Sequence, residues 1–330
     1  MFFHPSLILF VFFLLFSMIM MVSLNSWFFI WFFIEMNLLS FIPLILTKKN
    51  KFSVESSLKY FFIQTLSSIM ILMGLVMMFM DYVSYNIFFI SGLSIKLGLA
   101  PFHQWMVNIM EGLAWPLVYI LLTIQKIGPF ILFGYIYSMG ENLIYIIYLL
   151  SVTCSFFGCF GGLFTTSLRK VLVYSSISHA SWMILGLVYS LNLWFFYFVF
   201  YIIILFSVVY ILKCYNISNL NHLFLKLSFF GKLVLGVGVL SMGGMPPMTG
   251  FVSKFIMMKE FLMFYNYFIL FFLLLGVFIS LFFYSRVFMF NFIFMSNKNL
   301  FLSANQKNSS FSLFINIMGL ILVPFIIYFI

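Results

Sequence analysis

The sequence predicts an all-α protein that crosses a membrane many times, and three observations support this fold class. Of the 330 residues, 65% are hydrophobic and only 7% are charged. A water-soluble domain of this size carries more charge on its surface, so a lipid bilayer is the expected solvent. The apolar residues form runs of about 20, the length at which a helix spans a bilayer. Glycine and proline interrupt two of these runs.

We expect eleven membrane-spanning helices in a single membrane domain that covers residues 1–330. The apolar runs that predict them are 3–23, 26–47, 56–80, 84–106, 114–137, 142–164, 169–190, 192–213, 229–264, 266–290 and 311–330.

The fourth and ninth of these helices are predicted to be broken, because proline cannot donate a backbone hydrogen bond and its ring clashes with the preceding helical turn. The fourth helix contains Gly98 and Pro101. The ninth, which is also too long for one straight crossing, contains Gly243, Gly244, Pro246, Pro247 and Gly250.

The spacing of the two broken helices predicts an internal repeat. Helices five apart in the chain cross the membrane in opposite directions, and interrupted helices at matching positions are typical of inverted repeats in transporters. We therefore expect residues 1–137 and 142–290 to form two inverted five-helix repeats. The helix at 311–330 is then an addition to the second repeat.

The positive charges of the loops predict the topology. Only Lys259 falls on the side opposite the N-terminus, and three lysines lie inside spans. Cytoplasmic loops carry an excess of Lys and Arg, so the N-terminus is placed on the cytoplasmic or matrix side and the C-terminus outside. The net charge of +10 is scattered and forms no patch, so no nucleic acid is expected as a partner. The side of the membrane that holds the N-terminus has the other twelve of the 16 Lys and Arg residues: Lys48, Lys49, Lys51, Lys59, Arg169, Lys170, Lys213, Lys226, Lys232, Arg286, Lys298 and Lys307.

Four ionisable residues lie near the centres of predicted spans: Glu35, Lys96, Lys126 and Lys254. Each costs about 2.5–3.5 kcal/mol to insert into a membrane, and such residues usually face water or one another. A structural ion pair explains Glu35 and one lysine but leaves two lysines without a partner. Burial favours the neutral form of a lysine and a nearby carboxylate favours the charged form, so these residues can load and release a proton. We expect a proton relay.

His179 lies in the stretch SSISHASW and adds a titratable group to an apolar helix. A hydrogen-bonded core histidine and a member of the relay are both compatible with this position. Gly158 and Gly162 form a GxxxG pattern, which indicates close helix packing.

The chain shows no pattern for redox chemistry of its own. Cys154, Cys159 and Cys214 fit neither a disulfide framework nor a metal site. The sequence also lacks a phosphate-binding loop, a haem histidine pair and a set of iron–sulfur cysteines. We expect no cofactor and no metal in this chain.

Five stretches carry a resemblance to a known family: NSWFFIWFFIEMNLLSFIPL (25–44), SIKLGLAPFHQW (94–105), TIQKIGPF (123–130), TSLRKVLVYSSISHASWM (166–183) and GGMPPMTGFVSKF (243–255). The chain resembles the NADH–ubiquinone oxidoreductase chain 2 family, the mitochondrially encoded, antiporter-like subunits of respiratory complex I. The resemblance covers nearly the whole chain in the same order. The short eleven-helix form is similar to that of animals, and the Phe- and Met-rich composition is similar to that of arthropods.

The resemblance implies a role for each buried charge. Glu35 would pair with Lys96 and tune it, and Lys126 would connect two half-channels. Lys254 would lead onward to the outer side or to a neighbouring subunit, and His179 would belong to the same polar axis.

The resemblance also implies a setting. NADH oxidation and ubiquinone reduction would occur in other subunits, which hold NADH, FMN, iron–sulfur clusters and ubiquinone, while this chain translocates protons. Chains 4 and 4L, accessory subunits and lipids would be its neighbours in the mitochondrial inner membrane. The N-terminus would face the matrix and the C-terminus the intermembrane space. Two alternatives stay open: a subunit of a cation/proton antiporter, and a purely structural membrane scaffold.

Overall fold

Every named element is a helix in the part that the computed structural model describes, which comprises residues 5–48, 50–82, 85–139, 143–220, 222–223, 227, 229–264, 266–293 and 306–318. Within these ranges no named strand occurs, and one isolated antiparallel bridge joins Ser167 and Asn219. Helices suit a membrane because each satisfies its own backbone hydrogen bonds where no water is available. The predicted all-helical membrane class is confirmed.

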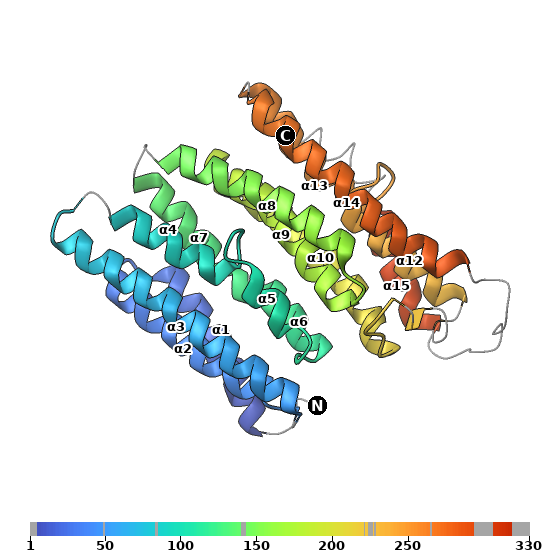
Figure 1. The fold of residues 1–330 in the computed structure, drawn as a ribbon, viewed down its shortest axis with the longest axis horizontal. Coiled ribbons are helices and arrows are strands. Elements are labelled where there is room, and N and C mark those ends of the chain that lie inside the picture. Colours follow the sequence, from blue (N-terminus) through green and yellow to red (C-terminus); the bar gives the residue numbers. More distant parts are fainter. Residues whose placement is uncertain are drawn as a thin grey trace. The chain divides into compact units, whose positions relative to one another are not determined.

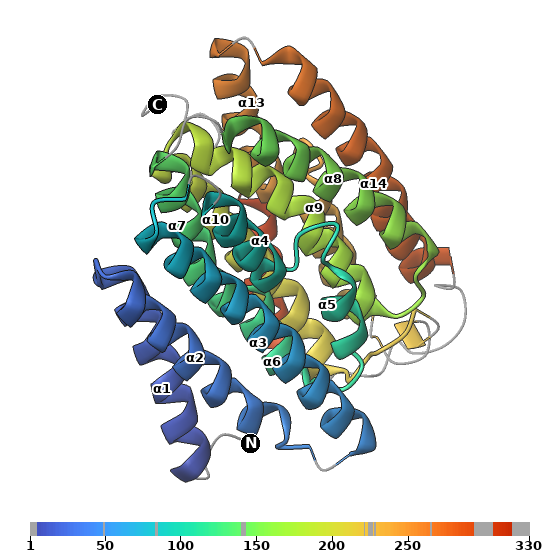
Figure 2. The same ribbon diagram turned by 60° about the vertical axis from the view of Figure 1, so that its left-hand side comes forward.

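The chain divides into two compact units, Met1–Ile147 and Tyr148–Ile330. In the first unit α2 packs against both α1 and α3, and α3 packs against α4 and α5 (Figures 1 and 2). Helix α7 contacts α1, α4 and α6. The helices of this unit are α1 (Pro5–Ser23), α2 (Trp27–Ile45), α3 (Lys51–Phe79), α4 (Tyr85–Leu97), α5 (Gln104–Ile109), α6 (Trp115–Leu122) and α7 (Ile124–Met139).

In the second unit, α10 and α13 are central to the packing. Helix α10 contacts α9, α12, α13 and α15, and α13 contacts α9, α12, α14 and α15. The division falls within the first turn or so of α8 (Ile144–Phe164), and the other helices of this unit are α9 (Leu168–Tyr189), α10 (Leu191–Cys214), α12 (Phe229–Gly243), α13 (Thr249–Met263), α14 (Tyr267–Ile293) and α15 (Gln306–Ile317).

Eight helical segments among the described residues are long and apolar enough to cross a membrane. They are α1, α2, α3, the segment Trp115–Ser138 formed by α6 and α7, α8, α9, α10 and α14. Two shorter apolar helices, α4 and α12, end at the predicted interruptions. The chain is therefore a multi-pass membrane protein.

Many polar side chains are buried inside the units, and many large aromatic side chains are exposed on their surfaces. Phe28, Phe62 and Phe268 are exposed, whereas many serines, such as Ser175 and Ser176, are buried. The buried serines donate their hydroxyl to the carbonyl three residues earlier, as Ser175 does to Leu172 at 2.8 Å. A helix can thus carry serine into an apolar interior without an unsatisfied hydroxyl. This distribution suits a lipid-facing surface.

The GxxxG pattern of α8 does bring helices close, but its two glycines face different partners. A Cβ on Gly158 would lie 2.6 Å from the backbone nitrogen of Ser178 on α9. A Cβ on Gly162 would lie 2.8 Å from the ring of Phe283 on α14. Close packing at both positions is confirmed.

Several details of the predicted spans differ from the structure, among them the start of α3, which lies at Lys51 and not at residue 56. The span 114–137 is not one continuous helix, because α6 ends at Leu122 and α7 begins at Ile124. Between them Thr123 has φ −119° and ψ −79°, a distorted right-handed conformation, and its hydroxyl donates to Tyr119 O at 2.6 Å. The last helix begins earlier than predicted, at Gln306, while residues 319–330 of the predicted span lie outside the described residues.

Candidate functional site

The first interruption begins with a glycine that closes the end of α4. Gly98 has a φ of +66°, a left-handed conformation that costs glycine little. Its backbone N–H donates to Ile95 O at 3.1 Å, and the N–H of Leu99 donates to Ser94 O at 3.0 Å. This pair of bonds is a Schellman motif, which satisfies carbonyls that a helix end leaves open. Turns that contain the cis peptide Ala100–Pro101 then lead to α5.

The second interruption begins in the same way at the end of α12. Gly244 has a φ of +79°. Its N–H donates to Ser241 O at 3.1 Å, and the N–H of Met245 donates to Leu240 O at 3.4 Å. Pro246 and Pro247 follow, and α13 begins at Thr249. The helices α4 and α12, one from each half of the chain, thus end with the same Schellman pattern of hydrogen bonds.

Each of these helix ends holds a lysine. Lys96 lies in the last turn of α4. Lys254 comes from α13, but its Nζ reaches back and donates to Gly243 O, the last carbonyl of α12, at 2.7 Å. The carbonyl end of a helix carries partial negative charge and stabilises a nearby cation. Both lysines therefore lie where helix geometry favours an ammonium group.

Lys96 is joined to its surroundings by an amide and not by a carboxylate. Its Nζ donates to Gln64 Oε1 on α3 at 3.3 Å. Glu35 on α2 interacts electrostatically with Lys96, but these two described residues form no ion pair within 4.0 Å. The charge of Glu35 thus acts on Lys96 from a distance, which leaves the ammonium free to exchange its hydrogen-bond partners.

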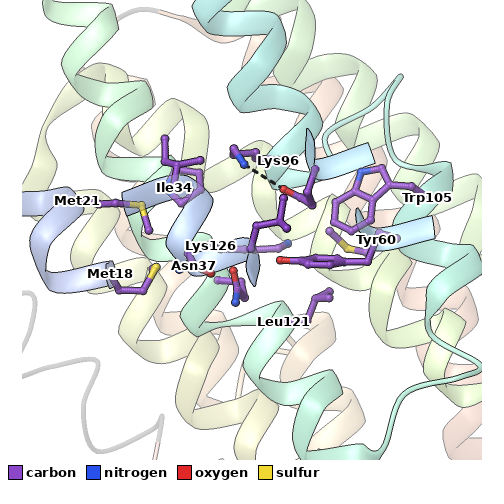
Figure 3. Close-up of a pocket in the computed structure, with 14 residues that line it drawn as sticks. Met18, Met21, Ile34, Asn37, Tyr60, Lys96, Trp105, Leu121 and Lys126 are labelled. Carbon is purple, nitrogen blue, oxygen red and sulfur yellow. Dashed lines mark hydrogen bonds between the residues drawn. The ribbon is translucent and has the colours of Figure 1, made fainter. Parts of the chain in front are cut away.

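A cavity of about 30 Å³ lies beside Lys96 and reaches Lys126 (Figure 3). One water needs about 10–15 Å³ of such space and two to four polar partners, so this cavity has room for about two waters. Its polar and aromatic lining comprises Asn37, Tyr60, Gln64, Lys96, Trp105, Gln125 and Lys126.

Two amides in this lining have polar atoms that the protein does not satisfy. Asn37 is 4% exposed, and neither its side-chain oxygen nor its nitrogen has a hydrogen-bond partner in the protein. The Nε2 of Gln125 also has none. A buried amide without a partner costs about 1–3 kcal/mol. Both amides face the space between the two lysines, which therefore suits hydrogen-bonded water.

Lys126 reaches the cavity from just beyond the interruption at Thr123. It is 3% exposed and lies in the first turn of α7, and its backbone N–H donates to Thr123 O at 3.0 Å. A helix that is interrupted three residues before a buried lysine gives that lysine backbone polar groups nearby.

In the second unit, Lys254 and His179 line one small cavity of about 10 Å³. Cys159 lines it too, and its thiol donates to Gly276 O at 2.7 Å. His179 is 7% exposed, and its Nδ1 lies 2.8 Å from the hydroxyl of Tyr197 on α10. The remaining polar lining is made of hydroxyls, from Ser155, Ser178, Ser181, Ser280 and Tyr284.

The structure brings the predicted residues together in two groups. Lys96 and Lys126 line the cavity of the first unit, and Glu35 acts electrostatically on Lys96. His179 and Lys254 share a cavity in the second unit. The sequence reasoning missed Asn37, Gln64, Gln125 and Tyr197. Asn37, Gln64 and Gln125 could have been found as amides inside apolar spans, and Asn37 also by its position two residues after Glu35.

Within the described residues, no group of three or more His, Cys, Asp or Glu side chains could hold a metal ion. The polar groups that the two units do gather are lysines, amides, hydroxyls and one imidazole. Lysine and imidazole can bind and release a proton, and the amides and hydroxyls can hydrogen-bond to water.

A multi-pass membrane fold with two interrupted helices, each with a buried or half-buried lysine at its carbonyl end, defines a class of ion-translocating membrane subunits. Residues 23–281 match the model of one such family, NADH:quinone oxidoreductase/Mrp antiporter, TM. The chain belongs to this family.

Relatives from insects are similar over most of their length. The chain is 38% identical to NADH-ubiquinone oxidoreductase chain 2 of Anopheles gambiae over 264 residues, which are 76% of this chain and 75% of the relative. It is 35% identical to the protein of the same name from Locusta migratoria over 72% of this chain and 71% of the relative. The resemblance to the chain 2 family is thereby confirmed.

A solved structure supports the fold. It is described as respiratory complex I from Thermus thermophilus with bound aureothin, and one of its chains matches with a TM-score of 0.82 at 20% identity. The match covers 97% of this chain and 77% of that chain. The antiporter-like fold is therefore shared despite the low identity.

Proposed function

We propose that this chain is a membrane subunit of an NADH–ubiquinone oxidoreductase and moves protons through its buried lysines. The relatives named chain 2 and the membership of the family support the enzyme complex. The observation that carries the proton path is the cavity between Lys96 and Lys126, with its unsatisfied amides.

The first step of this path is release of a proton from Lys96. Its ammonium is held by the amide of Gln64 and by the field of Glu35. Insertion of a charge into a membrane is costly, so a change that weakens the influence of Glu35 favours loss of the proton. Water in the cavity accepts this proton and passes it to Lys126, because water and the amides of Asn37 and Gln125 can form a continuous chain of hydrogen bonds.

Lys254 and His179 form the corresponding site of the second unit. Lys254 is buried, 4% exposed, and bonded to a backbone carbonyl. A proton that reaches this cavity has the lysine, the imidazole and several hydroxyls as successive partners. We infer that Lys254 passes protons onward to the outer side or to a neighbouring subunit.

The architecture that we propose has eleven spans with two inverted five-helix repeats. Eight spans, the two interrupted pairs α4–α5 and α12–α13, and α15 together make eleven. The matching Schellman ends at Gly98 and Gly244, five spans apart, support the repeat. The bias of positive charges supports an N-terminus in the matrix and a C-terminus in the intermembrane space of mitochondria.

The redox reaction belongs to other subunits of the complex in this proposal. They would hold NADH, FMN, the iron–sulfur clusters and ubiquinone, and the conformational or electrostatic signal of their reaction would drive proton movement here. Chains 4 and 4L, accessory subunits and lipids are the neighbours that we expect in the inner membrane.

The proposal is tested by replacing Lys96 with alanine and Glu35 with glutamine in the assembled complex. We expect proton movement and coupled NADH–ubiquinone reductase activity to fall, while the amount of assembled complex stays near that of the unchanged chain. Lys59→Ala is the matched control, because Lys59 is an exposed lysine that pairs with Glu55 on α3. Unchanged proton movement in both variants would favour the structural scaffold.

A cation/proton antiporter is the second candidate, because the matching family includes Mrp antiporters. Purification from native membranes separates the two functions. Iron–sulfur subunits and NADH–ubiquinone reductase activity should accompany the chain if it belongs to the oxidoreductase. A small, flavin-free complex that exchanges sodium for protons would decide for the antiporter.

A further inference from the structure

Two tyrosines of α10 hold the ring of His179 in the second unit. The Tyr197 hydroxyl lies 2.8 Å from His179 Nδ1. The ring of Tyr201, one turn further along the helix, lies 5.3 Å from the imidazole centroid at an interplanar angle of 49°. Tyr197 is 2% exposed and Tyr201 is 3% exposed. The imidazole is therefore held by a hydrogen bond with Tyr197 and by ring contacts with both tyrosines of the same helix.

His179 lines two cavities. The first is the one that it shares with Lys254. The second, also about 10 Å³, is lined by Tyr197, Tyr201 and Ser253. Each volume accommodates about one water. The imidazole and the hydroxyl bonded to it thus stand between two places where a proton carrier can lie.

The chemistry of the pair suits a transfer between these places. A neutral imidazole has one N–H donor and one acceptor nitrogen, and a phenol hydroxyl both donates and accepts. With Nδ1–H donating to the Tyr197 oxygen, Nε2 is the acceptor: it binds a proton from a carrier in one cavity to give imidazolium and releases that proton to a carrier in the other, so no proton leaves through Tyr197. The tautomer and orientation of a histidine are set by such a bond.

We propose that Tyr197 is a positioning residue for proton transfer, because its hydroxyl fixes the orientation and tautomer of His179 between the two cavities. The Tyr197 hydroxyl stays neutral and affects proton transfer only by holding the His179 ring. This inference rests on the proposed proton path through Lys254 and His179.

The test is Tyr197→Phe in the complete complex, with proton movement measured per assembled complex. This change removes the hydroxyl and keeps the ring, so the packing of α10 is retained. We expect about tenfold slower proton movement, which corresponds to about 1.4 kcal/mol. Tyr210→Phe is the matched control, because it removes a hydroxyl from the same helix but Tyr210 lines neither cavity; the rate should stay near that of the unchanged chain.

A combined variant separates positioning from packing. If Tyr197 acts through His179, Tyr197→Phe has no further effect on proton movement once His179 is replaced by phenylalanine. Wild-type proton movement in Tyr197→Phe, equal losses in Tyr197→Phe and Tyr210→Phe, or additive losses in the combined variant would each overturn the inference.

Lys96→Ala is measured in the same experiment. It separates failure of the inference about Tyr197 from failure of the proposed proton path. Loss of proton movement in Lys96→Ala together with normal Tyr197→Phe rejects only the role of Tyr197. Normal proton movement in both rejects the proton path and the role of Tyr197 together.

Discussion

The two interruptions end their helices identically but hold their lysines differently. Lys96 belongs to the helix before its interruption and donates to a side-chain amide, Gln64, at 3.3 Å. Lys254 belongs to the helix after its interruption and donates to a backbone carbonyl, Gly243, at 2.7 Å. A side-chain amide can rotate away, whereas the carbonyl is fixed by the helix. The first lysine is therefore built to exchange partners and the second to be held.

The cavities beside Lys96 and Lys254 differ in a way that agrees with this contrast. The cavity beside Lys96 is about 30 Å³ and contains a second lysine, whereas the one beside Lys254 is about 10 Å³ and is lined mainly by hydroxyls. Glu35 acts electrostatically on Lys96, and the lining of the Lys254 cavity contains no carboxylate. This contrast suggests that proton exchange is controlled in the first unit and carried onward in the second.

The largest expected effect is the difference between Lys96→Ala and Lys254→Ala. Removal of a positioned acid–base group costs about 100-fold or more, and we expect this for Lys96. Lys254→Ala should cost about tenfold, because water can take the place of the ammonium at the Gly243 carbonyl. Proton movement per assembled complex checks both. Equal losses would remove the functional difference between the two interruptions.

A smaller effect is expected when Asn37 is replaced by leucine, which has a similar size but no polar atoms. The water in the cavity then loses a partner, and proton movement should fall by up to about tenfold, the value of one hydrogen bond. The rate per assembled complex is again the measurement.

Asn291→Leu is the matched control for this change. Asn291 on α14 is fully buried, and neither polar atom of its side chain has a hydrogen-bond partner in the protein, but it does not line the cavities described above. Proton movement should stay unchanged in this variant. Equal slowing by Asn37→Leu and Asn291→Leu would show that the loss of a buried amide, and not of cavity water, is responsible.

The sequence predicts those features that one helix determines alone. Apolar length marks the spans, proline and glycine mark the interruptions, and a charge in an apolar run marks Lys96 and Lys254. The partners of these lysines depend on neighbouring helices. Gln64 becomes a partner of Lys96 only because α3 packs against α4.

The interruption at Thr123 was not predictable for a different reason. Threonine is ordinary inside a helix, and no glycine stands beside it. Its hydroxyl bonds to the carbonyl of Tyr119 four residues earlier, a local bond that competes with regular helix geometry. The role of Lys254 shows the same limit, since nothing in its sequence neighbourhood says that its Nζ returns to the end of α12.

The smallest effect is expected from Gly98→Ala and Gly244→Ala, which test whether the two helix ends are equivalent. A left-handed backbone costs roughly 1–2 kcal/mol for a residue with a Cβ, so both variants should lower the thermal stability of the complex. Gly128→Ala, inside α7, is the control for left-handed strain: its φ is not positive and a Cβ there would lie 3.1 Å from the flexible Sδ of Met21, so it should lower the thermal stability less. A Cβ at Gly244 would also lie 2.9 Å from Lys254 Cδ, whereas at Gly98 it would meet the flexible Cε of Met106. Gly244→Ala should therefore slow proton movement beyond its effect on stability, because it crowds Lys254 itself; Gly98→Ala displaces Met106, which lines the Lys96 cavity, and should slow it less because this side chain is flexible. Equal slowing would mean that both glycines serve only the helix ends, and the close contact of Gly244 with Lys254 would then have no functional consequence.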